Sequence, residues 1–175
     1  MAPAPILVID GHDGSGKSTV AGLLARRLGW VVARPFTGAV SQAFYRCLAQ
    51  DEPQQLHGIA RAAVARLEAL HAPGVVFDRH WVTMLSVLPQ RCWPGWLPSP
   101  PTLLCWADPL TTLARVSARG ETTRNTLELH QCSCALFREL AQHHELPVLN
   151  TTQLAPDRAL ATLRAQHPTL LAPWI

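Results

Sequence analysis

Residues 6–19 read ILVIDGHDGSGKST, and this stretch decides the fold that the sequence predicts. It begins with a continuous apolar run at 6–9, which is typical of a short parallel strand buried on both faces. A glycine-rich turn follows, and residues 14–28 then repeat apolar side chains at intervals of three and four, as an amphipathic helix does. The stretch therefore predicts a strand, a loop and a helix in direct succession.

The turn from Gly11 to Ser18, which we name the phosphate loop, matches the pattern G-x-x-x-x-G-K-[ST] at every fixed position. In such a loop the backbone N–H groups point at phosphate oxygens, and the start of the helix adds partial positive charge. Lys17, the only lysine of the chain, is expected to reach the β- and γ-phosphates, and the Ser18 hydroxyl to ligate Mg²⁺. The alternative is a glycine-rich turn that arose by chance. We expect ATP and Mg²⁺ as cofactors, with the loop contributing Gly11, Gly14, Ser15, Gly16, Lys17, Ser18 and Thr19.

Outside this loop, short apolar runs alternate with helical patterns along the chain. We expect further strands at 30–33, 75–77, 103–106 and 147–149, and further helices at 40–48, 59–70, 81–88, 109–118, 126–144 and 156–166. The prolines of residues 89–101 exclude a helix or a central strand and predict an irregular loop. The alternation predicts an α/β fold in one domain of 175 residues, a parallel sheet with helices on both faces.

Composition excludes several other classes of protein. The net charge of +3 is too small for a nucleic-acid coat, and no apolar stretch reaches the ~20 residues that cross a bilayer. We therefore expect neither a nucleic-acid polymer nor a membrane among the partners. No leader-like segment is visible, so we expect a cytoplasmic protein with reduced thiols. A GTPase would need an N-K-x-D motif, and the single lysine already lies in the phosphate loop.

Residues His130, Cys132 and Cys134 form an H-x-C-x-C pattern that invites a zinc hypothesis. They lie in an expected helix, where side chains two positions apart point in nearly opposite directions and cannot easily share one metal ion. We therefore expect these three residues to be ordinary members of the helix and not ligands of a zinc ion.

A second group of charged residues follows the expected strand at 75–77, where the chain continues Asp78-Arg79-His80. Ligands of open α/β sheets bind beyond the carboxyl ends of the strands, so Asp78 and Arg79 are expected beside the phosphate loop. An Asp there holds Mg²⁺ through water, and an Arg grips an acceptor phosphate through a bidentate pair. The alternative is a surface ion pair at the end of a strand.

These motifs resemble those of thymidylate kinases, in the same order, over roughly residues 5–165. The loop IDGHDGSGKST carries Asp13 where that family has Asp or Glu. The segment VVFDRHWVT resembles the family's strand ending in D-R-[YH], with His80 in place of a Tyr and Thr83 in place of a Ser. Residues 33–38 and 101–121 resemble two further family segments, the second with Asp108 at a strand end. The resemblance implies a P-loop nucleotide kinase fold with strand order 2-3-1-4-5, and a homodimer.

The resemblance also implies roles for single residues. Asp13 would hydrogen-bond the sugar of the acceptor and assist its attacking oxygen. A lid at about 115–125 would close its arginines over the transferring phosphoryl group and stabilise its charge. The alternative for Arg115 and Arg119 is a solvated helix face. The catalytic candidates are Lys17, Asp13, Arg79, Arg119 and Arg124, and Arg115 is a candidate for binding ATP.

On the acceptor side, Arg34 is a candidate ligand for a phosphate, and Phe36 and Trp81 are candidate walls for a base, with core packing as the alternative for Trp81. His12 is expected to face solvent or the acceptor. The substrate-binding candidates are Asp13, Arg34, Phe36, Arg79, His80, Trp81 and Thr83, and the metal candidates are Ser18 and Asp78.

The acceptor half departs from the thymidylate kinase pattern. Residues 84–88 read MLSVL where that family carries A-Y-Q, and a Trp- and Pro-rich loop with Trp93 and Trp96 replaces a helix. We expect transfer of the γ-phosphoryl of ATP to a nucleotide, with dTMP as the reference acceptor. The alternatives are a nucleoside or another small metabolite as the acceptor, and a nucleotide-binding module without turnover.

Overall fold

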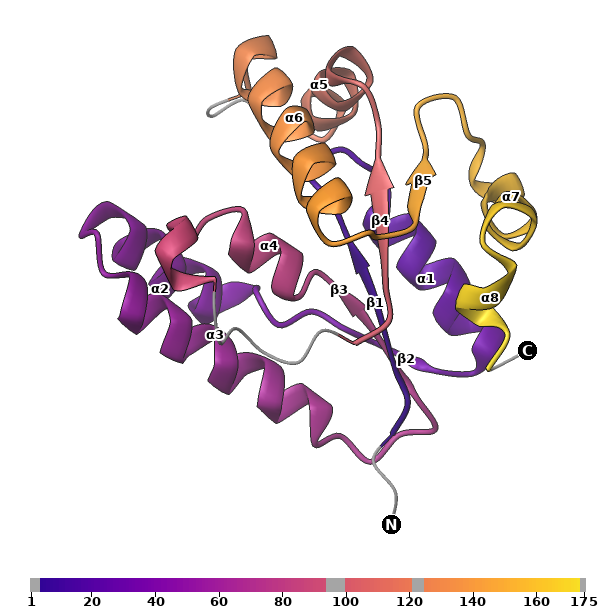
Figure 1. The fold of residues 1–175 in the computed structure, drawn as a ribbon, viewed down its shortest axis with the longest axis horizontal. Helices are drawn as coiled ribbons and strands as arrows, with labels where there is room; N and C mark the ends of the chain where they lie inside the picture. The colour runs from indigo at the N-terminus through magenta and orange to yellow at the C-terminus, as the bar shows by residue number, and fades with distance from the viewer. Residues whose placement is uncertain (1–3, 94–99, 121–124, 174–175) are drawn as a thin grey trace.

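A computed structural model describes residues 4–93, 100–120 and 125–173. Its centre is a five-stranded sheet in the order β2-β3-β1-β4-β5, with every neighbouring pair parallel (Figure 1). The strands are β1 (Ile6–Asp10), β2 (Val31–Ala33), β3 (Val75–Asp78), β4 (Thr102–Trp106) and β5 (Val148–Asn150). The predicted strands and their order are confirmed.

The helices mostly follow the predicted ranges, and the predicted helix at 109–118 matches α5 at both ends. The helix expected at 59–70 begins six residues earlier, because Pro53 occupies its first position, where the fixed φ of proline suits a helix. The described helices are α1 (Lys17–Leu28), α2 (Gly38–Ala49), α3 (Pro53–Glu68), α4 (Trp81–Leu85), α5 (Pro109–Ala118), α6 (Leu127–His143), α7 (Ala159–Gln166) and α8 (Pro168–Leu171), with short 3₁₀ turns at Gln90–Cys92 and Pro156–Arg158.

Both faces of the sheet are covered by helices. Successive side chains of a strand point in opposite directions, so each strand contributes to the core on both faces. Leu7 and Ile9 pack in a fully buried cluster with α1, α7 and α8, whereas Val8 lies in a cluster with α3. On the face of Val8, Leu104 packs against α4 and α6. In Figure 1, α1, α7 and α8 lie on one side of the sheet and α2, α3 and α4 on the other.

The carboxyl ends of the strands meet at one edge of the sheet, since all strands run in the same direction. The register pairs Ile9 with Asp78 and Asp10 with Leu104. The loop that follows β5 reaches the same place, because the Thr151 hydroxyl donates a 2.7 Å hydrogen bond to the Ser15 carbonyl. The phosphate loop is therefore surrounded by the ends of β3, β4 and β5, and the sequence predicts the first of these neighbours.

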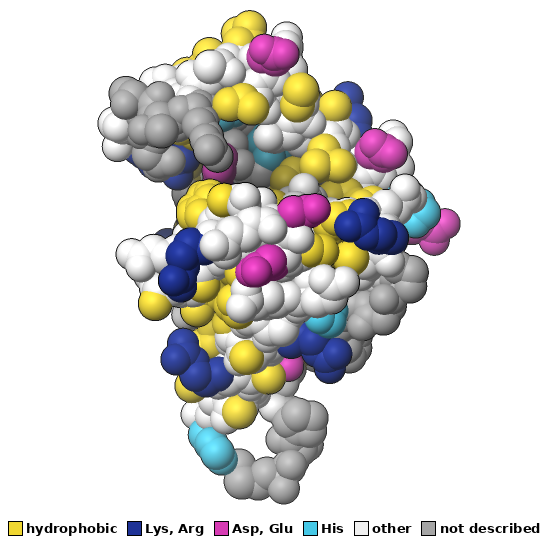
Figure 2. Space-filling view, turned by 90° about the vertical axis from the view of Figure 1, so that its left-hand side faces the viewer, with side chains coloured by type: hydrophobic (Ala, Val, Ile, Leu, Met, Phe, Trp, Pro, Cys, Tyr) yellow, Lys and Arg dark blue, Asp and Glu magenta, His cyan; other side chains and the backbone are white. Residues whose placement is uncertain are grey.

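The proline-rich stretch is described only in part. Trp93 donates its indole N–H to the Leu88 carbonyl at 3.2 Å, which anchors the start of the stretch, while Trp96 lies outside the described residues. Basic side chains are spaced apart on the face of the molecule seen in Figure 2 and do not merge into one patch there. Among the helices of the described ranges, none has the length and apolar character needed to cross a bilayer.

Candidate active site

The phosphate loop joins β1 to α1 with a backbone that only glycine adopts without strain. Gly14 has φ 75°, and a Cβ built there would lie 2.8 Å from backbone atoms of Thr112 in α5. Gly16, with φ 82°, is the N-cap of α1, so that helix begins at Lys17. Because Gly14 has no side chain, the loop can pack directly on α5. The N–H groups of the loop then lie at the start of α1.

Lys17 is buried, yet it points into the loop. Its Nζ donates to the His12 carbonyl at 3.1 Å and lies 3.8 Å from the Asp13 carboxylate. Burial and the positive charge of Arg79 lower the pKa of Lys17 to about 8. A nearby phosphate would favour the charged form again, so the lysine is placed as an anion-binding group.

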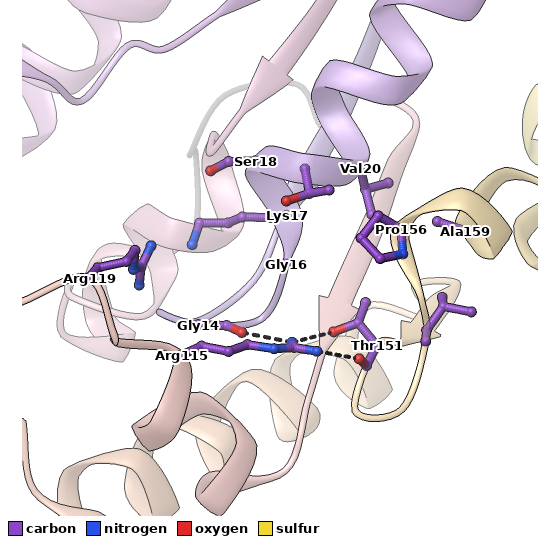
Figure 3. Close-up of a pocket in the computed structure, with 12 residues that line it drawn as sticks. Gly14, Gly16, Lys17, Ser18, Val20, Arg115, Arg119, Thr151, Pro156 and Ala159 are labelled. Carbon is purple, nitrogen blue, oxygen red and sulfur yellow. Dashed lines mark hydrogen bonds between the residues drawn. The ribbon is translucent and has the colours of Figure 1, made fainter. Parts of the chain in front are cut away.

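A cavity of about 390 Å³ lies beside the loop (Figure 3). The start of α1 forms one wall, α5 another, and the segment after β5 a third. The lining includes six of the residues expected to bind ATP or its phosphates, namely Gly14, Gly16, Lys17, Ser18, Thr19 and Arg115. Gly11 and Ser15 belong to the buried base of the loop, where the Ser15 hydroxyl has no hydrogen-bond partner among the described residues.

Arg115 acts as a clamp across this cavity. Its guanidinium donates to the Gly14 carbonyl at 3.0 Å and to the Thr151 carbonyl at 2.7 Å (Figure 3). It therefore joins the phosphate loop to the segment after β5. Arg119, the C-cap of α5, lines the same cavity, whereas Arg124 lies outside the described residues.

The Asp13 carboxylate contacts two cations, Lys17 and Arg79. The Arg79 guanidinium forms an ion pair with this carboxylate, which is 65% exposed. Partial desolvation opposes ionisation of Asp13, but Arg79 and Lys17 outweigh it and hold the pKa of this carboxyl below its usual value. Arg79 has φ 77°, a strained conformation for a residue with a side chain, and such strain is concentrated at functional sites.

Asp78 and Arg34 form a second ion pair beside this one. The Arg34 Nε donates to Asp78 Oδ2 at 3.0 Å, and Asp78 is 5% exposed. Its other oxygen, Oδ1, is buried without a hydrogen-bond partner among the described residues. A buried, unpaired carboxylate oxygen fits an oxygen-ligated cation, so Asp78 and the exposed Ser18 hydroxyl suit the expected Mg²⁺.

Asp10, at the end of β1, is the residue that sequence reasoning missed. Its carboxylate is fully buried and accepts hydrogen bonds from the Gly11 and His80 amides and from both the amide and the hydroxyl of Thr83. It therefore fixes the turn that presents Arg79. An acidic residue at the end of a buried strand, directly before the loop, was the available signal.

His12 does not face solvent or an acceptor, so that expectation was wrong. The residue is 1% exposed, and its ring contacts Trp106 and Phe137 edge to face. The reason is the path of the loop, which turns this side chain inward beneath the phosphate site, toward β4 and α6.

The remaining acceptor candidates lie mainly in the interior. Trp81 is 4% exposed and donates its indole N–H to the Thr102 hydroxyl at 2.8 Å, which is the core role weighed for it as the alternative. His80 is fully buried against Phe77. Phe36 packs on Phe44 with ring centroids 4.9 Å apart.

The three side chains of the H-x-C-x-C pattern lie in α6 in different surroundings. His130 is hydrogen-bonded to the Asn125 side chain, Cys132 is exposed, and Cys134 is buried beside His12. Within the described ranges, no group of three or more His, Cys, Asp or Glu side chains is placed to hold a metal ion.

No family model matches the chain. It is 46% identical over 69 residues to a cytidylate kinase from Pseudomonas putida, which covers 39% of the chain and 27% of that protein. It is 39% identical over 92 residues to a cytidylate kinase from Azotobacter vinelandii, covering 52% and 35%. The chain thus spans about a third or less of the length of these curated relatives.

Similarity to solved structures extends over nearly the whole chain. Deoxyadenosine kinase from M. mycoides, solved with bound dATP, superposes with a TM-score of 0.66 and 13% identity, covering 94% of this chain and 100% of that one. TT1252 from Thermus thermophilus superposes with a TM-score of 0.56 and 22% identity, covering 95% and 99%. The fold is therefore that of the P-loop nucleotide kinases.

The partial sequence matches are to cytidylate kinases, and one of the structural neighbours is a deoxyadenosine kinase, so these comparisons do not point to thymidylate kinases in particular. The single domain, the homodimer and the cytoplasmic location stay predictions.

Proposed function

We propose that the chain transfers the γ-phosphoryl group of ATP to a nucleotide acceptor, with dTMP as the reference acceptor. One observation carries the proposal: Asp13 contacts both the lysine of the phosphate loop and the arginine after β3. Lys17 borders the cavity proposed for ATP, and Arg79 belongs to the strand end proposed for the acceptor. The site thus has a donor side and an acceptor side that share one carboxylate.

On the donor side, the loop amides and Lys17 bind the β- and γ-phosphates, and Arg119 stabilises charge that grows on the transferring group. Ser18 and Asp78 would hold Mg²⁺, which neutralises phosphate charge when bound. Arg115 keeps the loop and the segment after β5 at a fixed separation, since its two terminal nitrogens already donate to the Gly14 carbonyl and to the hydroxyl and carbonyl of Thr151.

On the acceptor side, Arg79 and Arg34 are cations that a phosphate-bearing acceptor could bind. Each is paired with a carboxylate, Arg79 with Asp13 and Arg34 with Asp78. An incoming phosphate would compete for these arginines, and Asp13, once released, would accept a hydrogen bond from the sugar. The planar guanidinium suits a phosphate better than an ammonium group would.

A second candidate is a nucleoside acceptor, and the Arg79–Asp13 pair favours it. With no acceptor phosphate to bind, Arg79 would keep its contact with Asp13, and that carboxylate would take the proton of the attacking hydroxyl. The structural similarity to deoxyadenosine kinase also supports this candidate.

Release of ADP in the presence of single acceptors separates these proposals. The panel contains dTMP, CMP and dCMP as nucleotides, and thymidine, deoxycytidine and deoxyadenosine as nucleosides. Strict dependence on a nucleotide supports the first proposal, and strict dependence on a nucleoside supports the second. ATP binding without ADP release under any of these conditions favours the binding module and contradicts both.

A further inference from the structure

The imidazole of His12 is buried beneath the phosphate loop and has a specific partner for each nitrogen. Nδ1 lies 3.1 Å from the Asp13 carbonyl, and Nε2 accepts the Ala107 amide N–H at 3.4 Å. The Asp13 carbonyl can only accept a hydrogen bond, so Nδ1 carries the proton. The Ala107 amide can only donate one, so Nε2 carries none. The ring must therefore be the neutral Nδ1–H tautomer.

Ala107 is held by a second group on the same side. The Cys134 thiol donates to the Ala107 carbonyl at 3.3 Å, and its sulfur lies 3.8 Å from His12 Nδ1. Trp106 and Phe137 pack edge to face on the ring and complete its enclosure. His12 thus connects the phosphate loop, the end of β4 and helix α6 at one buried point.

The hydrogen bond between the Ala107 amide and His12 is important because of where Ala107 lies. Ala107 directly precedes Asp108, the N-cap of α5, and α5 carries Arg115 and is followed by Arg119, its C-cap. Two further contacts join the same elements, namely the close packing of Gly14 on α5 and the hydrogen bond from Arg115 to the Gly14 carbonyl. His12 fixes the base of α5 while these contacts fix its first two turns.

We propose that neutral His12 is a positioning residue that holds the phosphate loop against α5, so that Lys17 and Arg119 act on the same triphosphate. The link to ATP rests on the proposed function, whereas the state of the ring does not. An apolar side chain of similar size would fill the space but would leave the Ala107 N–H buried without an acceptor, which is costly.

The charged and titratable groups around His12 agree with a neutral ring. Lys17 and Asp13 face it from the loop, and His130 and Cys134 face it from α6. Burial lowers the pKa of His12 to about 4, and Lys17 and His130 act in the same direction, although the carbonyl and the carboxylate of Asp13 oppose them. The contact is therefore complete throughout the neutral pH range.

Two substitutions separate positioning from packing. His12→Leu removes both hydrogen bonds, whereas His12→Gln retains an acceptor for the Ala107 amide. We expect His12→Leu to weaken ATP binding about tenfold or more and His12→Gln to recover most of that loss. His144→Leu, which removes an imidazole that packs on Trp81, is the matched control. Melting curves of all variants test whether they fold.

The ring itself is tested by nitrogen NMR of the parent and by hydrogen exchange of the Ala107 amide. We expect the Nδ1–H tautomer at pH 7 and a protected amide that loses protection in His12→Leu. An Nε2–H tautomer, or a folded His12→Leu variant that binds ATP as the parent does, would overturn the proposal. A parent that binds no ATP contradicts the proposed function and the positioning role together, and the tautomer then decides the contact alone.

Discussion

Asp10 and Thr83 are 73 positions apart in the sequence, yet the Asp10 carboxylate accepts both the amide and the hydroxyl of Thr83, at 3.0 and 2.6 Å. The His80 amide donates to the same carboxylate at 2.9 Å. His80 is the N-cap of α4, and Thr83 lies in its first turn. Asp10, at the end of β1, therefore accepts hydrogen bonds from N–H groups at the start of that helix. The turn that carries Arg79 is thereby fixed to the base of the phosphate loop.

Asp10→Asn should destabilise the protein by about 1–3 kcal/mol, since its amide group would face buried donors that then lack an acceptor. Thr83→Val, which removes only the hydroxyl, should cost less. Urea unfolding of both variants measures the difference. If Asp10→Asn unfolds at the urea concentration of the parent, the carboxylate does not hold this turn.

The phosphate loop and the strand order could be predicted because their signals are local. Four apolar residues, a glycine pattern and a helical repeat follow one another within residues 6–28. Asp78 and Arg79 were found because they directly follow a strand, and strand ends meet at one edge of a parallel sheet.

The contacts of Asp10 and His12 could not be predicted because their partners are distant in sequence. Asp10 binds Thr83, and His12 binds Ala107, 95 positions away. A histidine inside a glycine-rich loop has no periodicity that indicates whether it points inward. Trp81 shows the same limit, since its partner, the Thr102 hydroxyl, belongs to β4 and lies 21 positions further along the chain.

Asp78→Asn should lower activity and raise the Mg²⁺ concentration needed for half-maximal activity. The amide keeps the size of the side chain but removes the charge that attracts the cation. Arg34→Gln, which removes the partner of Asp78 and leaves the carboxylate, should not raise this Mg²⁺ requirement. Titration of activity against Mg²⁺ compares the three proteins. Overlapping curves for Asp78→Asn and the parent would limit Asp78 to a structural role.

Arg79→Lys should fail to restore the activity that Arg79→Ala loses, if the acceptor carries a phosphate. A lysine keeps the charge but lacks the planar fork that binds two phosphate oxygens. The loss should appear mainly as a higher KM for the acceptor, with a smaller change in the KM for ATP. Parent-like kinetics of Arg79→Lys with a nucleotide would refute bidentate binding of the acceptor phosphate by Arg79 and favour a nucleoside acceptor.

His12 should make the protein less stable in acid. The pKa of its ring is about 4 in the folded protein against 6.5 in a model compound, so the unfolded chain takes up a proton first as the pH falls. Stability is therefore lost progressively between pH 6.5 and 4, by about 3 kcal/mol in total from this residue. His12→Gln should show a shallower decline in its free energy of unfolding. His71→Gln, which changes an exposed histidine, should follow the parent, and identical slopes for His12→Gln and the parent would contradict the buried neutral ring.

The central claim, that this site transfers the γ-phosphoryl group of ATP, is tested most directly with γ-labelled ATP and Lys17→Ala. Lys17 is the only lysine of the chain and contacts Asp13 at the junction of the donor and acceptor sides. Arg27→Ala, which removes an exposed cation from the same helix, is the control. The account predicts that label reaches the acceptor with the parent and with Arg27→Ala. With a folded Lys17→Ala variant, it predicts that the rate of transfer falls by a factor of about 10²–10³ or more. Transfer by Lys17→Ala at the rate of the parent would contradict it.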